Sequence, residues 1–99
     1  MMVEVANAAE LERMLRVVRD TLADHGLRAR AQVMHDLMCD WQDAKTRDAR
    51  RQVAHRITAS SSGAGSWSDQ YLPEPASAQA QAEFRKALDY LCDLAFSFR

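Results

Sequence analysis

The sequence has few residues that interrupt a helix, since only three glycines and two prolines occur among its 99 residues. All of them except Gly26 fall between residues 60 and 75. With hydrophobic residues at 47% and charged residues at 27%, the composition excludes a fibrous or broadly disordered chain. No stretch approaches the roughly 20 apolar residues of a membrane helix, so we expect no membrane partner.

Cysteine is also scarce, with only Cys39 and Cys92. The N-terminus lacks the basic segment and the long apolar segment of a secretory signal. Because cytoplasmic proteins rarely keep disulfides, we expect two free thiols and a cytoplasmic location. The length fits a single helical domain that spans residues 1–99.

Neither charge sign is in large excess, because 13 basic and 14 acidic residues give a net charge of −1. Residues 27–59 are the only basic region, with seven basic and four acidic side chains. Their arginines are densest in residues 46–59 and are either a surface for phosphate backbones or a solvated helix face. No aromatic side chains are interleaved with them, which favours the solvated face, and we expect no nucleic-acid partner.

Apolar residues recur at helical spacing in four segments and predict an all-α fold, a small four-helix bundle-like domain. We expect the first helix to begin with Asn7 as its N-cap and to end at Gly26. The second is expected over residues 27–43, and the third over residues 46–59 with Thr46 as its cap.

The last helix is expected to run from Ser77 to the C-terminus. Its apolar stripe is the clearest in the chain and consists of Phe84, Leu88, Leu91, Ala95 and Phe98. We therefore expect this helix at the centre of the bundle.

Residues 60–75 show no lasting period, and we expect one long ordered loop there before the last helix. Ser66 and Asp69 have the spacing of a capping box, which predicts a short helical turn from Trp67 to Tyr71. Trp67 and Tyr71 would share one face of this turn. They are either a small core under the loop or an exposed anchor for a partner.

Three carboxylates, Asp36, Asp40 and Asp43, follow one another at helical spacing and share one face of the second helix. Such a row either meets a basic partner or is a solvated face. In the second case its ion-pair partners would come from the next helix, from Arg47, Arg50 or Arg51.

His35 and Cys39 also lie one turn apart, a spacing that lets two side chains share a zinc ion. A complete site needs two further ligands, and no Cys-x-x-Cys motif supplies them. The acidic row likewise lacks the Glu-x-x-His pairs that accompany carboxylate metal sites in helical bundles. We expect neither a metal nor a cofactor.

An Arg-x4-His pattern at Arg50 and His55 is similar to the active-site motif of HEPN-type helical ribonucleases, in which Arg steadies phosphate and His transfers a proton. Arg30 and His35 have the same spacing, as chance predicts in an arginine-rich chain. We expect no enzymatic activity and keep a helical ribonuclease as an alternative.

One loop segment carries a family resemblance. Residues 62–69, Ser-Gly-Ala-Gly-Ser-Trp-Ser-Asp, resemble the Gly-Gly-Met-Gly-Ser-Leu-Asn-Asp segment of a family of short uncharacterised bacterial helical proteins. The match rests on Gly63, Gly65, Ser66 and Asp69. Members of that family look like immunity proteins, so the resemblance implies a non-enzymatic binder of a toxin domain.

The sequence thus predicts a bacterial immunity protein that occludes the active site of a toxin. Its expected contacts are the acidic row and the loop, namely Asp36, Asp40, Asp43, Trp67, Asp69 and Tyr71. A homodimeric scaffold, built on surplus apolar surface of the last helix, is a further alternative.

Overall fold

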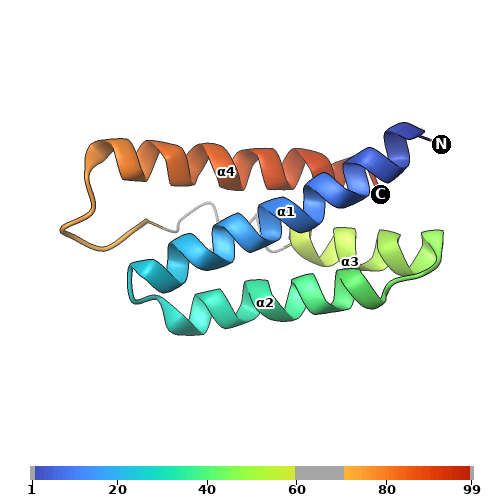
Figure 1. Cartoon of the computed structure of the whole chain (residues 1–99), viewed down its shortest axis with the longest axis horizontal. Coiled ribbons are helices and arrows are strands. Elements are labelled where there is room, and N and C mark those ends of the chain that lie inside the picture. Colours follow the sequence, from blue (N-terminus) through green and yellow to red (C-terminus); the bar gives the residue numbers. More distant parts are fainter. Residues whose placement is uncertain (1, 60–70, 99) are drawn as a thin grey trace.

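The computed structural model describes residues 2–59 and 71–98, which form four helices (Figure 1). They are α1 (Met2–Asp24), α2 (Arg28–Asp43), α3 (Arg47–Ala59) and α4 (Ala78–Phe96). No strand occurs in these two ranges. The predicted all-α, bundle-like fold is therefore confirmed.

The helices pack in a ring rather than around a central one. α1 packs against α2 and α4, while α3 packs against α4 and α2. Figure 1 shows α1 between α4 and α2, with α3 alongside the second half of α2. Our expectation that the last helix is central is wrong, because its regular apolar stripe serves two neighbours, as the stripe of α1 also does.

The first helix begins earlier than the sequence suggested. α1 starts at Met2, and the predicted N-cap Asn7 lies inside it, half-buried. No glycine or proline interrupts this segment, and an asparagine inside a helix costs only a few tenths of a kcal/mol. The neighbouring Ala8 already belongs to the core, so packing extends the helix through the capping residue.

The cap predicted at Thr46 is confirmed, and a second cap lies at Ser77, where the last helix was expected to begin. The Oγ1 atom of Thr46 accepts a hydrogen bond from the backbone N–H of Ala49 at 3.1 Å. The Oγ atom of Ser77 accepts one from the N–H of Ala80 at 3.0 Å, at the start of α4. Each cap satisfies a backbone donor that the helix itself leaves unpaired.

Gly26 ends α1 as predicted, with a positive φ of 78°. Its N–H donates to the carbonyl of Ala23 at 3.0 Å, and the N–H of Leu27 donates to that of Leu22 at 2.9 Å. This pair of bonds is the Schellman motif, which reverses the chain into α2.

We expect Gly26→Ala to lower the free energy of unfolding by about 1 kcal/mol, because side chains with a Cβ disfavour this conformation. A Cβ built at Gly26 meets no atom within 4 Å, so the loss comes from the backbone alone. Gly26→Asn should lose less, since asparagine tolerates positive φ better. Urea unfolding of both variants measures the difference, and equal losses would contradict this explanation.

The predicted apolar stripes form one core. Its largest side chains that are almost fully excluded from solvent are Leu11, Leu15, Val18, Leu22, Met34, Ile57 and Leu91. In α4, the expected positions Phe84, Leu88 and Ala95 are buried as well. Phe98 lies just beyond α4 and is half-buried against this core.

Trp41 joins the parts of the bundle near the end of α2. Its ring is buried, and its Nε1–H donates to the carbonyl of Ala8 in α1 at 3.1 Å. The ring of Phe98 meets it edge-on at 5.0 Å between centroids, and the guanidinium of Arg50 in α3 lies 5.8 Å from its centroid. One side chain therefore holds α1, α2, α3 and the C-terminal segment together.

Only residues 71–75 of the expected long loop are described. Leu72 is buried, and its N–H donates to Oε1 of Gln81 at 2.9 Å. The Nε2 atom of Gln81 donates in turn to the carbonyl of Leu72. This reciprocal pair fixes the chain against α4 just before that helix begins.

Candidate functional site

The three carboxylates of the predicted acidic row lie on the outer side of α2. Asp36 and Asp43 are exposed, and Asp40 is half-buried. Asp36 accepts a hydrogen bond from Nε2 of Gln32 at 2.9 Å, within the same helix. The row is thus a solvent-facing line of negative charge along the second half of α2.

Asp40 has an ion-pair partner in α3 that the sequence did not suggest. The Nη1 atom of Arg56 lies 2.7 Å from Oδ2 of Asp40, and both side chains are about half exposed, at 54% and 46%. Two of the expected partners are engaged elsewhere. Arg50 donates from Nε to the carbonyl of Ala44 at 3.3 Å, and Arg51 pairs with Asp48 at 2.5 Å.

A hollow of about 270 Å³ lies between α2 and α3, next to the acidic row. Asp40 and Asp43 line it from α2, and Arg56 and Gln52 line it from α3. Its apolar lining comes from Ala44, Ala49 and Val53. The hollow therefore combines an apolar floor with two carboxylates.

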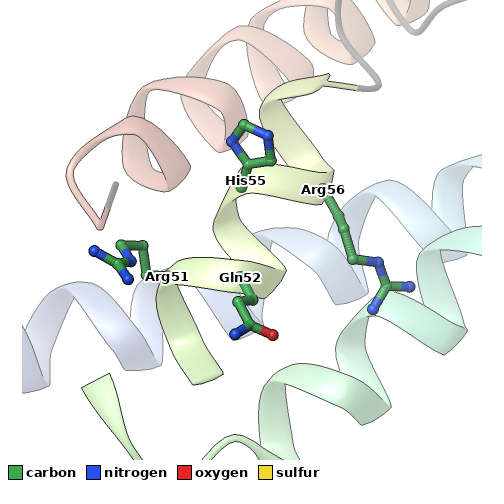
Figure 2. Close-up of a pocket in the computed structure, with 4 residues that line it drawn as sticks. All are labelled: Arg51, Gln52, His55 and Arg56. Carbon is green, nitrogen blue, oxygen red and sulfur yellow. The ribbon is translucent and has the colours of Figure 1, made fainter. Parts of the chain in front are cut away.

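A second hollow, of about 520 Å³, lies on the outer surface of α3. Its lining residues are Arg51, Gln52, His55 and Arg56. Figure 2 shows their side chains spread over this surface, with Arg56 reaching toward α2. The sequence reading treated these arginines as a solvated helix face and missed the hollow, because surface shape depends on the packing of α3 against its neighbours.

The two hollows are contiguous, since Gln52 and Arg56 line both. We call the combined surface the α2–α3 face and define it by Asp36, Asp40, Asp43, Arg51, Gln52, His55 and Arg56. It is acidic along α2 and basic along α3. The Asp40–Arg56 ion pair marks the boundary between the two halves.

The other half of the predicted partner site lies only partly within the described structure. Tyr71 is 68% exposed, and the guanidinium of Arg85 in α4 stands 5.5 Å from its ring centroid. Trp67 and Asp69, with the predicted turn from Trp67 to Tyr71, lie outside the described residues. Tyr71 is thus an exposed aromatic side chain beside a cation.

Arg50 and His55 do not form a pair. Residues five apart on a helix are rotated by about 140° from each other. Arg50 is half-buried against Trp41 and the end of α2, whereas His55 is exposed in the outer hollow. The other match, His35, faces α1 and contacts Arg19 there.

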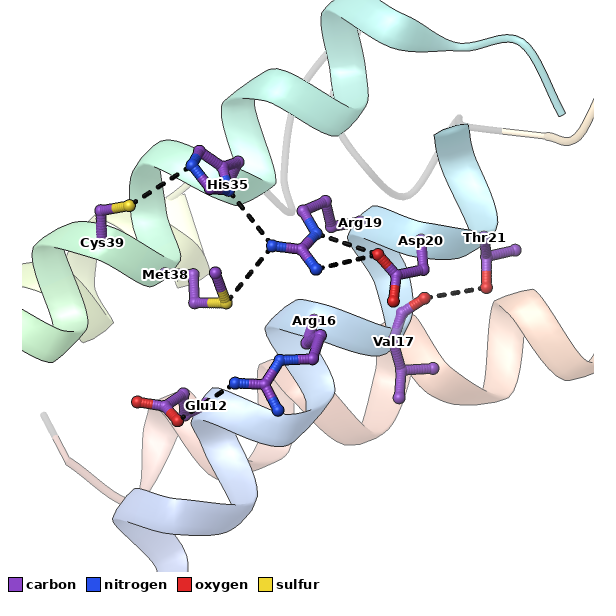
Figure 3. Close-up of polar contacts among 9 residues, drawn as sticks. All are labelled: Glu12, Arg16, Val17, Arg19, Asp20, Thr21, His35, Met38 and Cys39. Carbon is purple, nitrogen blue, oxygen red and sulfur yellow. Dashed lines mark hydrogen bonds and ion pairs between the residues drawn. The ribbon is translucent and has the colours of Figure 1, made fainter. Parts of the chain in front are cut away.

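A polar cluster between α1 and α2, which the sequence did not reveal, surrounds Arg19 (Figure 3). The Nη1 atom of Arg19 lies 3.2 Å from Nδ1 of His35 and 3.9 Å from the sulfur of Met38. The Nη2 atom of Arg19 lies 3.0 Å from Oδ1 of Asp20. Because a guanidinium only donates, Nδ1 of His35 accepts this hydrogen bond. The cluster ties α1 to α2.

His35 and Cys39 are adjacent, as their spacing predicted, with Nε2 and Sγ 3.6 Å apart. Both cysteines are free thiols. Among residues 2–59 and 71–98, no group of three or more His, Cys, Asp or Glu side chains has the geometry to hold a metal ion.

Comparison with protein families, with curated proteins and with solved structures finds no match. None of the helices in the described part of the chain combines the length and the apolar character that crossing a bilayer requires. The functional argument therefore rests on the chemistry of the surfaces just described.

Proposed function

We propose that this chain is a non-enzymatic bacterial immunity protein, which binds a cognate toxin and occludes its active site in the cytoplasm. The observation that carries the interface is the hollow between α2 and α3. The class of partner rests on the resemblance of residues 62–69 to loops of immunity-like proteins. These two supports are independent of each other.

The hollow fits a cationic side chain of a partner. An inserted Arg or Lys lays its aliphatic stem against Ala44, Ala49 and Val53, as such stems do on apolar surfaces. Its charged group then reaches Asp40 and Asp43 at the edge of the hollow. A pocket that fills with one anchor residue is typical of the centre of a protein interface.

The acidic row also suits the class of partner. Toxins that act on nucleotides or nucleic acids have basic clefts, and a line of exposed carboxylates complements such a cleft. Complementary charge accelerates encounter more than it adds affinity, and salt screens it. Tyr71, exposed beside Arg85 of α4, offers an aromatic contact outside this row.

The experiment begins with the full chain immobilised to capture its partner from the native host. The captured protein is then expressed alone and with this chain, and bacterial growth is measured. We expect toxicity that co-expression relieves. The double variant Asp36→Lys/Asp43→Lys should weaken binding roughly 10- to 100-fold at low salt, and less at high salt.

Asp36 and Asp43 are chosen because reversing Asp40 would also break its pair with Arg56. The matched control is Asp89→Lys/Asp93→Lys, which reverses two exposed carboxylates one turn apart on α4. A captured partner that is not toxic would remove the immunity assignment. Equal weakening in both double variants would remove the acidic row from the interface.

A further inference from the structure

We propose that the hollow on the outer surface of α3 binds a small ligand that carries phosphate groups. Its four lining side chains are Arg51, Gln52, His55 and Arg56. Each of them can donate N–H hydrogen bonds, and the two guanidinium groups can do nothing else. Figure 2 shows the four groups spread around one stretch of α3.

This hollow is open to solvent and wide enough for a small molecule. Its volume of about 520 Å³ falls within the roughly 300–1,000 Å³ of typical ligand pockets. A single inorganic phosphate would leave most of that space empty. The geometry therefore points to a larger anion, such as a nucleotide or a short polyphosphate.

The charge of α3 favours a multiply charged anion. The helix carries four arginines and one aspartate, so its potential is positive along its length. Arginine presents a planar fork of donors that matches two oxygens of one phosphate group. Arg51 and His55 lie one turn apart on the same side of the helix, so neighbouring phosphates of one ligand can engage both, with Gln52 beside them.

The carboxylate of Asp48, in the same helix, already contacts two of the donors that line this hollow. Asp48 lies 2.5 Å from Nη2 of Arg51, and it accepts a hydrogen bond from Nε2 of Gln52 at 3.1 Å. Arg51 and Asp48 are both about 60% exposed, at 60% and 63%, so this ion pair contributes little to stability. A ligand of higher charge can displace the single carboxylate from both donors.

The proposal does not depend on the immunity assignment. The phosphate site uses the basic half of the α2–α3 face, whereas the protein partner uses the acidic half. Gln52 and Arg56 line both hollows, and Arg56 is also paired with Asp40. Variants at Arg51 and His55 therefore test the ligand, and variants at Asp36 and Asp43 test the partner.

Calorimetric titration of the full chain with sodium tripolyphosphate and with ATP tests the proposal. We expect saturable binding at one site, weakened by added salt. Arg51→Glu should reduce the affinity at least tenfold, since it replaces a charge-assisted hydrogen bond by repulsion. Nuclear magnetic resonance should place the ligand-induced shifts on the backbone amides of residues 51–56.

Arg13→Glu is the matched control. Arg13 is exposed to the same degree as Arg51, at 58%, and pairs with Glu10 three residues earlier, as Arg51 pairs with Asp48. It should change the affinity less than twofold, whereas His55→Ala should weaken it. Equal losses in Arg13→Glu and Arg51→Glu, no saturable binding, or binding of single-stranded RNA alone would each overturn the proposal.

Discussion

Leu88→Ala is expected to lower the free energy of unfolding by about 2–5 kcal/mol. Leu88 is 2% exposed in the middle of α4, a helix that packs against both α1 and α3. The truncated side chain leaves a cavity that two neighbouring helices cannot close without disturbing their other contacts. Since small domains have about 5–15 kcal/mol of stability, this variant should be close to unfolding at physiological temperature.

Urea denaturation followed by circular dichroism measures this loss. Val33→Ala is the control, because Val33 is 45% exposed on α2 and alanine is the better helix former. Its stability should stay within about 0.5 kcal/mol of the parent chain. A loss below about 1 kcal/mol for Leu88→Ala would mean that the apolar stripe of α4 contributes little to the stability of the core.

Those parts of the fold that depend on local chemistry were predictable from the sequence. The left-handed position of Gly26 and the cap at Thr46 follow from residue type and spacing alone, and both are confirmed. The start of α1 was not predictable from Asn7. A possible cap acts only if the chain before it is not helical, and the burial of Ala8 shows packing that reaches past this residue.

In the candidate site, too, the features that depend on local spacing were predictable from the sequence, and those that depend on the packing of helices were not. Helical spacing was enough to place Asp36, Asp40 and Asp43 on one face of α2. The hollow beside them needs α3, whose position no local pattern gives. The ion-pair partner of Asp40 is Arg56, 16 residues away, rather than the arginines nearer in sequence.

The way in which α3 packs against α2 explains why Arg56 is the partner of Asp40. Arg50 occupies the side of α3 that packs against Trp41, so it cannot reach the acidic row. Arg51 pairs with Asp48 in the same helix. Arg56, five residues further on, lies on the side that faces Asp40. This pairing can be identified only once the orientation of the apolar stripe of α3 in the bundle is known.

Trp41→Ala is expected to cost about 3–5 kcal/mol, the largest loss we predict for a single side chain. Trp41 is 4% exposed and contacts three other parts of the chain, at Ala8, Arg50 and Phe98. Its removal opens a cavity at the point where α2 turns into α3. The α2–α3 face should therefore lose its shape together with the stability of the bundle.

A milder series separates packing from the aromatic contact. Trp41→Leu removes the aromatic ring and the hydrogen bond to Ala8 but keeps an apolar side chain, and Phe98→Leu removes the edge-on partner. A double-mutant cycle over these two changes should give a coupling of about 0.5–1.5 kcal/mol, as measured for aromatic pairs. Urea unfolding by circular dichroism gives all four stabilities. Zero coupling would show that Phe98 packs beside Trp41 without stabilising it, and the C-terminal segment would then not help to hold the α2–α3 face.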